Sequence, residues 1–110
     1  MSQLTTHILD TSLGRPAAGV FVALYQGTSD ENIAYGTTNA DGRIPDLLPL
    51  GQRLVPGIYR LQFLIGDYFK NQGVTTFYPF VDIWFHVADD SHYHVPLLLN
   101  PFGFSTYRGS

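Results

Sequence analysis

The fold class is decided by residues 58–65, which read Ile58-Tyr59-Arg60-Leu61-Gln62-Phe63-Leu64-Ile65. In this stretch the polar residues Arg60 and Gln62 alternate with large apolar residues. Successive side chains of a β-strand point to opposite faces, so this period of two predicts a strand with one buried face. Residues 80–87 repeat the alternation, and residues 20–25 are rich in the β-branched and aromatic side chains that favour strands. We therefore expect a chain built mainly from β-strands.

Glycine and proline mark the turns between these strands. The chain has 11 Gly and 7 Pro, and turn signals recur at a spacing typical of many short strands. The one plausible helix is short, covers residues 67–72 and ends at Gly73 as a left-handed cap. We expect an all-β sandwich in a single domain over residues 1–110, although periodicity alone does not separate a sandwich from a closed barrel.

The composition excludes several classes of protein. With 45% apolar residues and a net charge of -3, the 110-residue chain is expected to fold around one core. Six Lys and Arg against nine Asp and Glu, with no basic run, argue against nucleic acid as a partner. The lack of cysteine removes disulfides, thiol catalysis and cysteine-bound zinc. Only 14% of the residues are charged, which suggests that self-association covers part of the surface.

The sequence also bears on location. No stretch approaches the roughly 20 apolar residues that a membrane helix needs, so no membrane association is expected. Residues 1–7 lack a basic start followed by an apolar run, so we read no secretory signal and expect a cytoplasmic protein.

Four histidines, at positions 7, 86, 92 and 94, are the first candidates for chemistry, because imidazole exchanges protons near neutral pH. Strand geometry places His92 and His94 on one face, about 7 Å apart. Three interpretations of this pair stay open from the residues alone. The two rings are polar residues on a solvated strand face, or they bind zinc together with a third histidine, or they belong to a catalytic site.

The other candidate residues are less informative when each is taken alone. His7 lies in an alternating segment before a turn, and Arg43 follows the turn at residues 39–42. An arginine in that place is commonly a solvated charge, but its planar fork of donors also suits a clamp on an anion or a carbonyl group. The aromatic residues at 101–104 indicate that the C-terminal residues 105–110 pack against the protein.

Taken together, these motifs resemble those of the 5-hydroxyisourate hydrolases, the transthyretin-related enzymes of urate breakdown. The matching motifs are, in chain order, Thr6-His7-Ile8-Leu9-Asp10-Thr11, Gly14-Arg15-Pro16-Ala17, Thr38-Asn39-Ala40-Asp41-Gly42-Arg43, His92-Tyr93-His94-Val95-Pro96-Leu97-Leu98-Leu99 and the terminal Tyr107-Arg108-Gly109-Ser110. They span the whole chain. The chain departs from the family at Asn100, where serine is common, and at Phe102 and Phe104, where tyrosine is common.

The resemblance implies a transthyretin-like sandwich of two four-stranded antiparallel sheets with one short helix. It also implies a homotetramer, a dimer of dimers, with the sites in a channel between paired dimers. The implied catalytic residues are His7, Arg43, His94 and Ser110. The implied substrate-binding residues are His7, Arg43, Tyr107, Arg108 and Gly109, and the resemblance leaves His92 as a partner that orients His94. No cofactor and no metal are expected.

The implied reaction opens a ring amide of 5-hydroxyisourate, a small molecule, to give 2-oxo-4-hydroxy-4-carboxy-5-ureidoimidazoline. It needs an activated water, a stabilised oxyanion and a proton for the departing nitrogen. In this interpretation His94 and His7 handle the protons, Arg43 binds substrate oxygens, Ser110 positions the water or a histidine, and Tyr107 walls the ring. Three alternatives remain: a transthyretin-like carrier of a small aromatic ligand, a zinc hydrolase that uses the His-x-His pair, and a purely structural sandwich module.

Overall fold

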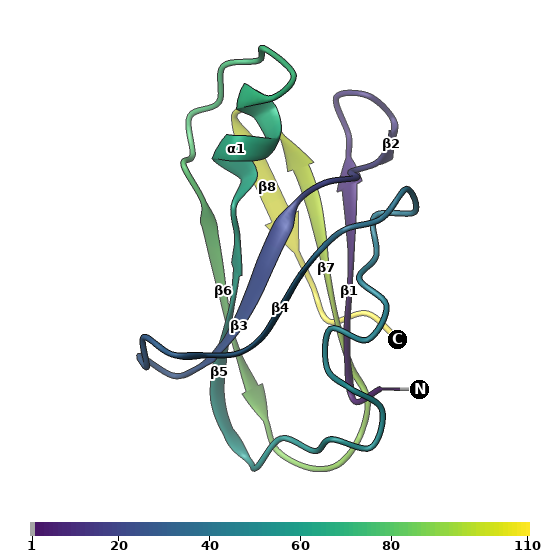
Figure 1. Cartoon of the computed structure of the whole chain (residues 1–110), viewed down its shortest axis with the longest axis vertical. Coiled ribbons are helices and arrows are strands. Elements are labelled where there is room, and N and C mark those ends of the chain that lie inside the picture. Colours follow the sequence, from purple (N-terminus) through teal and green to yellow (C-terminus); the bar gives the residue numbers. More distant parts are fainter. Residues whose placement is uncertain (1) are drawn as a thin grey trace.

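The structure of the protein is a computed structural model and describes residues 2–110. Two four-stranded sheets are present, one with strand order β2-β1-β7-β8 and one with strand order β4-β3-β5-β6 (Figure 1). The elements are β1 Leu4–Asp10, β2 Arg15–Pro16, β3 Phe21–Gln26, β4 Asn32–Thr37, β5 Gly57–Phe63, α1 Ile65–Lys70, β6 Val81–Val87, β7 Tyr93–Asn100 and β8 Gly103–Thr106. The predicted sandwich with one short helix is confirmed, and the barrel is excluded because neither sheet closes on itself.

Side-chain alternation separates an inner and an outer face on each strand. In β5 every second residue from Tyr59 to Phe63 is buried, as the alternation of Arg60 and Gln62 predicted. In β1 the buried residues are those at positions 4, 6, 8 and 10, which leaves Thr5 and His7 on the outer face. Apolar residues from both sheets form one core cluster between them. The outer face of the sheet that contains β1 is therefore the face that carries the candidate histidines.

The expectation that both sheets are antiparallel is wrong for one pair of strands. Strands β1 and β7 pair in parallel, with Thr5 opposite His94 and His7 opposite Pro96. Adjacent parallel strands need a long crossover connection, and here nearly the whole chain lies between the two strands. Strand direction is therefore set by contacts between the two ends of the chain, which local sequence patterns do not record. This parallel pair brings the N-terminal and C-terminal motifs side by side.

The helix begins two residues earlier than the predicted range 67–72. Ile65 and Phe69, four residues apart, are buried on one helix face and anchor it to the core. The backbone N–H of Gly66 in the first turn donates to the Pro79 carbonyl at 3.0 Å, which satisfies a group that a helix leaves unpaired. The sequence analysis assigned Ile65 to the preceding strand because its apolar run continues that of β5.

The helix end also differs from the prediction. The C-cap is Asn71, whose backbone N–H bonds to the Asp67 and Phe69 carbonyls and whose conformation is right-handed. Gly73, with φ of 70°, makes the left-handed turn two residues beyond the cap. Gly73 thus turns the chain out of the helix instead of capping it directly.

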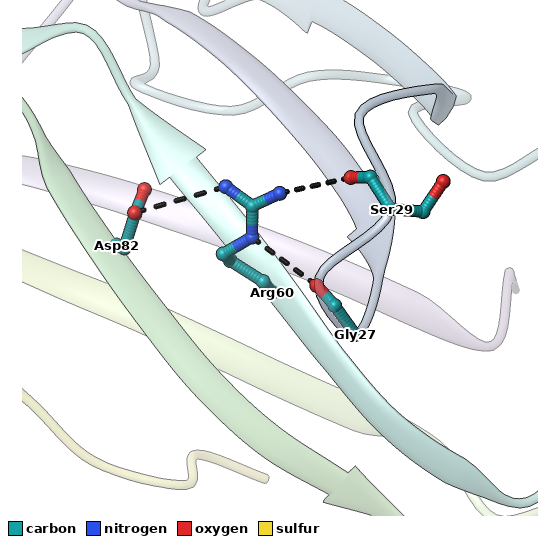
Figure 2. Close-up of polar contacts among 4 residues, drawn as sticks. All are labelled: Gly27, Ser29, Arg60 and Asp82. Carbon is teal, nitrogen blue, oxygen red and sulfur yellow. Dashed lines mark hydrogen bonds and ion pairs between the residues drawn. The ribbon is translucent and has the colours of Figure 1, made fainter.

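On the outer face of the second sheet, which contains β4, β3, β5 and β6, Arg60 makes several polar contacts (Figure 2). The guanidinium of Arg60 lies 4.3 Å from the Tyr25 ring centroid and forms an ion pair with Asp82 at 3.7 Å. It also donates to the carbonyls of Gly27 and Ser29, at 3.3 and 3.1 Å. These contacts tie the turn between β3 and β4 to β5 and β6.

Replacing Arg60 with methionine is expected to destabilise the fold by about 1–3 kcal/mol, because Asp82 loses its cation and two carbonyls lose charged donors. Lysine at this position should recover part of the loss, since it keeps the charge without the planar fork. Urea unfolding monitored by circular dichroism measures both values. An Arg60→Met protein with the wild-type unfolding midpoint would show that these contacts contribute nothing to stability.

Candidate active site

His7 and Arg43 are brought together by the turn that follows β4. The two residues form an isolated antiparallel bridge, and the backbone N–H of Ile8 donates to the Gly42 carbonyl at 2.9 Å. Asn39 closes the turn: its N–H donates to the Arg43 carbonyl at 2.8 Å, and its side-chain oxygen accepts the Arg43 N–H at 3.1 Å. The backbone of Arg43 is therefore fixed beside the histidine strand, while its side chain is exposed to solvent.

His94 is joined to the C-terminal tail in the same way. It bridges to Gly109, whose backbone N–H donates to the His94 carbonyl at 2.8 Å. A Cβ atom on Gly109 would lie 2.5 Å from Cδ2 of the His94 ring, a distance that side chains do not adopt. Glycine is thus required for the tail to pass the imidazole this closely. Ser110 follows directly and is exposed.

The two histidines of the His-x-His motif are linked by a hydroxyl group. The Thr5 Oγ1 atom lies 2.9 Å from Nε2 of His92 and 2.7 Å from Nδ1 of His94. The two rings stack with centroids 6.3 Å apart. The sequence analysis did not single out Thr5. Its position two residues before His7, on the same face of an alternating strand, was the signal that could have identified it.

The electrostatic surroundings keep His94 neutral. Burial lowers the pKa of His94 below its usual value of 6.5, and the positive groups of Arg43, His92 and His7 lower it further. A neutral imidazole at neutral pH is able to accept a proton. A guanidinium near such a group can hold a negatively charged or carbonyl-rich ligand, so the pair suits reactions that move a proton and develop an oxyanion.

A hollow of about 280 Å³ lies beside these residues. It is lined by Ser2, Thr5, Thr6, Asn39, Asp41, Arg43, Ile44, Pro45 and Asp46. We call it the Arg43 hollow. Thr5 lines it from β1 and Arg43 lines it from the turn after β4, so the residue that contacts the imidazoles of His92 and His94 and the candidate oxyanion-binding arginine border the same space.

Tyr107 and Arg108 of the C-terminal tail do not line the Arg43 hollow. Tyr107, 59% exposed, and Arg108 line a second hollow of about 270 Å³ at the edges of β6 and β8, together with Trp84 and His86. The guanidinium of Arg108 lies 4.3 Å from the Tyr93 ring centroid. It also donates to the His92 carbonyl at 3.1 Å and to the Ser91 hydroxyl at 3.3 Å. Within one chain Arg108 holds the segment before β7, and the substrate-binding roles of Tyr107 and Arg108 stay predictions.

Two findings bear on the alternatives. Across residues 2–110 no group of three or more His, Cys, Asp or Glu side chains is placed to bind a metal ion. In the same part of the chain no helix has the length and hydropathy to cross a membrane.

Comparison with known proteins gives a consistent result. A family model described as "HIUase/Transthyretin family" matches residues 4–109. The chain is 50% identical to 5-hydroxyisourate hydrolase 2 of Rhizobium meliloti, over 98% of this chain and 96% of that protein. The structure of Klebsiella pneumoniae 5-hydroxyisourate hydrolase matches with a TM-score of 0.87 and 41% identity, over 100% of this chain and 94% of that chain. Sea bream transthyretin, solved in complex with thyroxine, matches with a TM-score of 0.88 and 35% identity, over 97% of this chain and 94% of that chain.

Proposed function

The chain belongs to the HIUase/transthyretin family, and from this premise we propose that it is a hydrolase that opens a ring amide of 5-hydroxyisourate. The observation that carries the proposal is the meeting of His7, Arg43 and His94 around one sheet face, with the tail at Gly109 against the His94 ring. The reaction belongs to urate degradation. No cofactor and no metal are part of the proposal.

We assign the protons of the reaction to the imidazoles. Neutral His94 takes a proton from a water molecule as the water oxygen attacks the carbonyl carbon of the ring amide. The carbonyl oxygen becomes an oxyanion, and the Arg43 guanidinium stabilises the negative charge that develops there. When the tetrahedral intermediate collapses, the C–N bond breaks and the nitrogen takes the proton, which leaves a carboxylate on the carbon. His7, on the adjacent strand, is assigned to deliver or relay that proton.

The C-terminal tail completes the proposed site. Gly109 lets the chain pass close to the His94 ring, and in this proposal Ser110, the next residue, orients the attacking water. In this proposal Tyr107, Arg108 and Gly109 also contact the substrate, with Tyr107 as a wall for its ring. Because Tyr107 and Arg108 lie at the edges of β6 and β8, such contacts require the substrate to be shared with another chain.

The homotetramer, a dimer of dimers with sites between paired dimers, is therefore part of the proposal. The exposed side chains of Trp84, Tyr107 and Phe104 near the open edges of both sheets support association of chains. Light scattering on the purified protein tests the tetramer. The cytoplasmic location stays a prediction of the sequence, and fractionation of cells that express the protein tests it.

A carrier function is the second candidate, because transthyretin with bound thyroxine has the same fold. The side chains favour the hydrolase. A carrier needs an apolar channel that binds without reacting, whereas this sheet face presents two imidazoles and a guanidinium. The full-length relative at 50% identity is likewise a hydrolase by name.

The decisive experiment measures the decay of freshly generated 5-hydroxyisourate by its ultraviolet absorbance, with and without the purified protein. The wild-type protein should accelerate the decay. The acceleration should survive exhaustive treatment with a chelator, which separates this proposal from a zinc hydrolase. Arg43→Ala should lose most of the acceleration, because the oxyanion then has no cation beside it. A wild-type protein that leaves the decay rate unchanged would end the hydrolase proposal.

The rate of 5-hydroxyisourate hydrolysis should persist to a lower pH than it would if the base were a histidine with the usual pKa. Burial and neighbouring positive charge lower the pKa of His94, so its neutral form remains populated as the pH falls below 6.5. The acid limb of kcat/KM against pH is therefore expected to have its midpoint below 6.5. Added salt should move this midpoint upward, because it screens the repulsion from Arg43, His92 and His7. An acid limb centred above 6.5 would contradict the role of His94 as the base.

Gly109→Ala should lower kcat by about 100-fold, since the new methyl group displaces the His94 ring. Gly103→Ala is the matched control in the same C-terminal segment, because its Cβ would make ordinary contact with Asn100 at 3.6 Å. The two variants are compared by steady-state kinetics and by thermal unfolding. Equal kcat values in the two variants would show that the tail does not set the position of the imidazole.

A further inference from the structure

The proposed mechanism gives no role to the Thr5 hydroxyl group, although this group lies between two imidazoles of the sheet face. It contacts Nδ1 of His94 at 2.7 Å and Nε2 of His92 at 2.9 Å. Its position is fixed by the parallel pairing of β1 and β7, in which Thr5 lies directly opposite His94. Both contacts have the length of strong hydrogen bonds, so the proton arrangement within this group of three is constrained.

A hydroxyl group has one proton to donate and two lone pairs, and a neutral imidazole has one donor and one acceptor nitrogen. If His94 donates from Nδ1 to Thr5 Oγ1, the hydroxyl proton is free to be donated to Nε2 of His92. If the hydroxyl proton is donated to Nδ1 of His94 instead, His92 must donate from Nε2. The hydroxyl oxygen can also accept from both rings through its two lone pairs, and in that case His94 is again protonated on Nδ1. Whenever the hydroxyl proton lies between Oγ1 and one of the two rings, the protonated nitrogen of one ring determines that of the other.

The two arrangements differ in what His94 can do. In the first, Nε2 of His94 is unprotonated and can accept a proton from water. In the second, Nε2 carries the proton and the ring cannot act as a base from that atom. The tail at Gly109 approaches the Cγ–Cδ2 edge of the ring, while Nδ1 contacts Thr5. Only a ring that carries its proton on Nδ1 leaves Nε2, the nitrogen that does not contact Thr5, free to act as a base.

We propose that Thr5 is a positioning residue, whose hydroxyl group accepts a hydrogen bond from Nδ1 of His94 and donates one to Nε2 of His92. It thereby holds His94 in the tautomer with a free Nε2 atom and couples this tautomer to that of His92. This inference rests on the proposed hydrolase function for its kinetic consequence, but the proton arrangement itself is a property of the free protein.

The test compares three variants. Thr5→Val removes the hydroxyl group and keeps the branched shape, and Thr5→Ser restores the hydroxyl group. Thr76→Val is the matched control, because Thr76 loses a hydrogen bond of 2.6 Å to the Pro101 carbonyl and lines neither of the two hollows. Thermal unfolding of all three separates loss of stability from loss of the tautomer.

The first measurement is ¹⁵N NMR of the histidine rings in the free protein, which reads the tautomer without substrate. We expect His94 to carry its proton on Nδ1 in the wild-type and Thr5→Ser proteins, and to show a mixture of tautomers in Thr5→Val. The second measurement is steady-state kinetics. We expect Thr5→Val to lower kcat by about 10- to 100-fold with little change in KM, and Thr5→Ser and Thr76→Val to stay near the wild-type kcat.

Two results would overturn the inference: a wild-type His94 with its proton on Nε2, or a Thr5→Val protein that keeps the wild-type tautomer and kcat. Failure of the hydrolase proposal is distinguishable from both results. In that case the wild-type protein does not accelerate the decay of 5-hydroxyisourate, while the NMR experiment still decides which nitrogen of His94 is protonated.

Discussion

His94→Asn is expected to lower kcat for 5-hydroxyisourate by about 10²- to 10⁴-fold, the range by which a positioned general base accelerates such reactions. The asparagine amide can replace the imidazole in the contact with Thr5, which lies 2.7 Å from Nδ1, so the strand pairing should be kept. What is lost is the group that stays neutral at neutral pH and accepts the proton of the attacking water. KM should change less than kcat, because the lost interaction acts in the transition state.

His86→Asn is the matched control for this prediction. His86 is exposed on β6 in the other sheet and lines the second hollow, away from Thr5 and Arg43. Its replacement should lower kcat far less than His94→Asn does, because His86 takes no part in the proposed proton transfer. Any effect should appear in KM, since His86 shares the second hollow with the proposed substrate-binding residues Tyr107 and Arg108. A positioned general base usually contributes at least about 100-fold to the rate. If His94→Asn keeps more than about a tenth of the wild-type kcat, the loss is smaller than this contribution and His94 is not the base.

Gly42→Ala is expected to be strongly destabilising, because a positive φ and a Cβ contact under 3.0 Å coincide at this glycine. At Gly42 φ is 72°, and an added Cβ would lie 2.4 Å from the Ile8 carbonyl oxygen. That oxygen accepts the backbone N–H of Ala17, and the Gly42 carbonyl accepts the N–H of Ile8 at 2.9 Å, so neither side can move freely. We expect a loss of at least about 2 kcal/mol in the free energy of unfolding, from the backbone conformation and the collision together.

Gly73→Ala separates the two contributions. Gly73 has nearly the same φ, 70°, and a Cβ there meets nothing within 4 Å, so only the conformational cost of about 1–2 kcal/mol should appear. Urea unfolding of the two variants gives the difference. Gly42→Ala should also raise KM, because it displaces the neighbouring Arg43 from the β1 strand. Equal stability of the two variants would show that the turn yields to the new methyl group without cost.

The strands of the second sheet were largely predictable from sequence. The alternation of Arg60 and Gln62 with apolar residues is local, because burial of one strand face imposes a period of two on consecutive residues. The structure confirms strands over most of the ranges 58–65 and 80–87. The start of the helix was not predictable in this way, since Ile65 continues an apolar run and its helical conformation depends on contacts with the core.

The candidate site was predictable in part. Motif resemblance singled out His7, Arg43 and His94 as a set. In the structure these three residues lie on or beside the parallel strands β1 and β7. Resemblance did not indicate that Thr5 bridges two imidazoles. Nor did it indicate that the Arg108 guanidinium lies over the Tyr93 ring instead of the Arg43 hollow. Such contacts depend on side-chain directions across different strands, which a linear motif does not contain.

By itself the sequence determined the β-rich class, the positions of most turns and the residue types available for proton transfer and oxyanion binding. Those properties follow from the alternation, the glycine and proline spacing and the chemistry of each side chain. Only the tertiary structure decided that β1 and β7 run parallel, that Thr5 joins His92 to His94, and which nitrogen of each ring contacts Thr5. The physical reason is that these arrangements arise from hydrogen bonds and packing between residues nearly ninety positions apart. The local sequence of either strand therefore does not determine them.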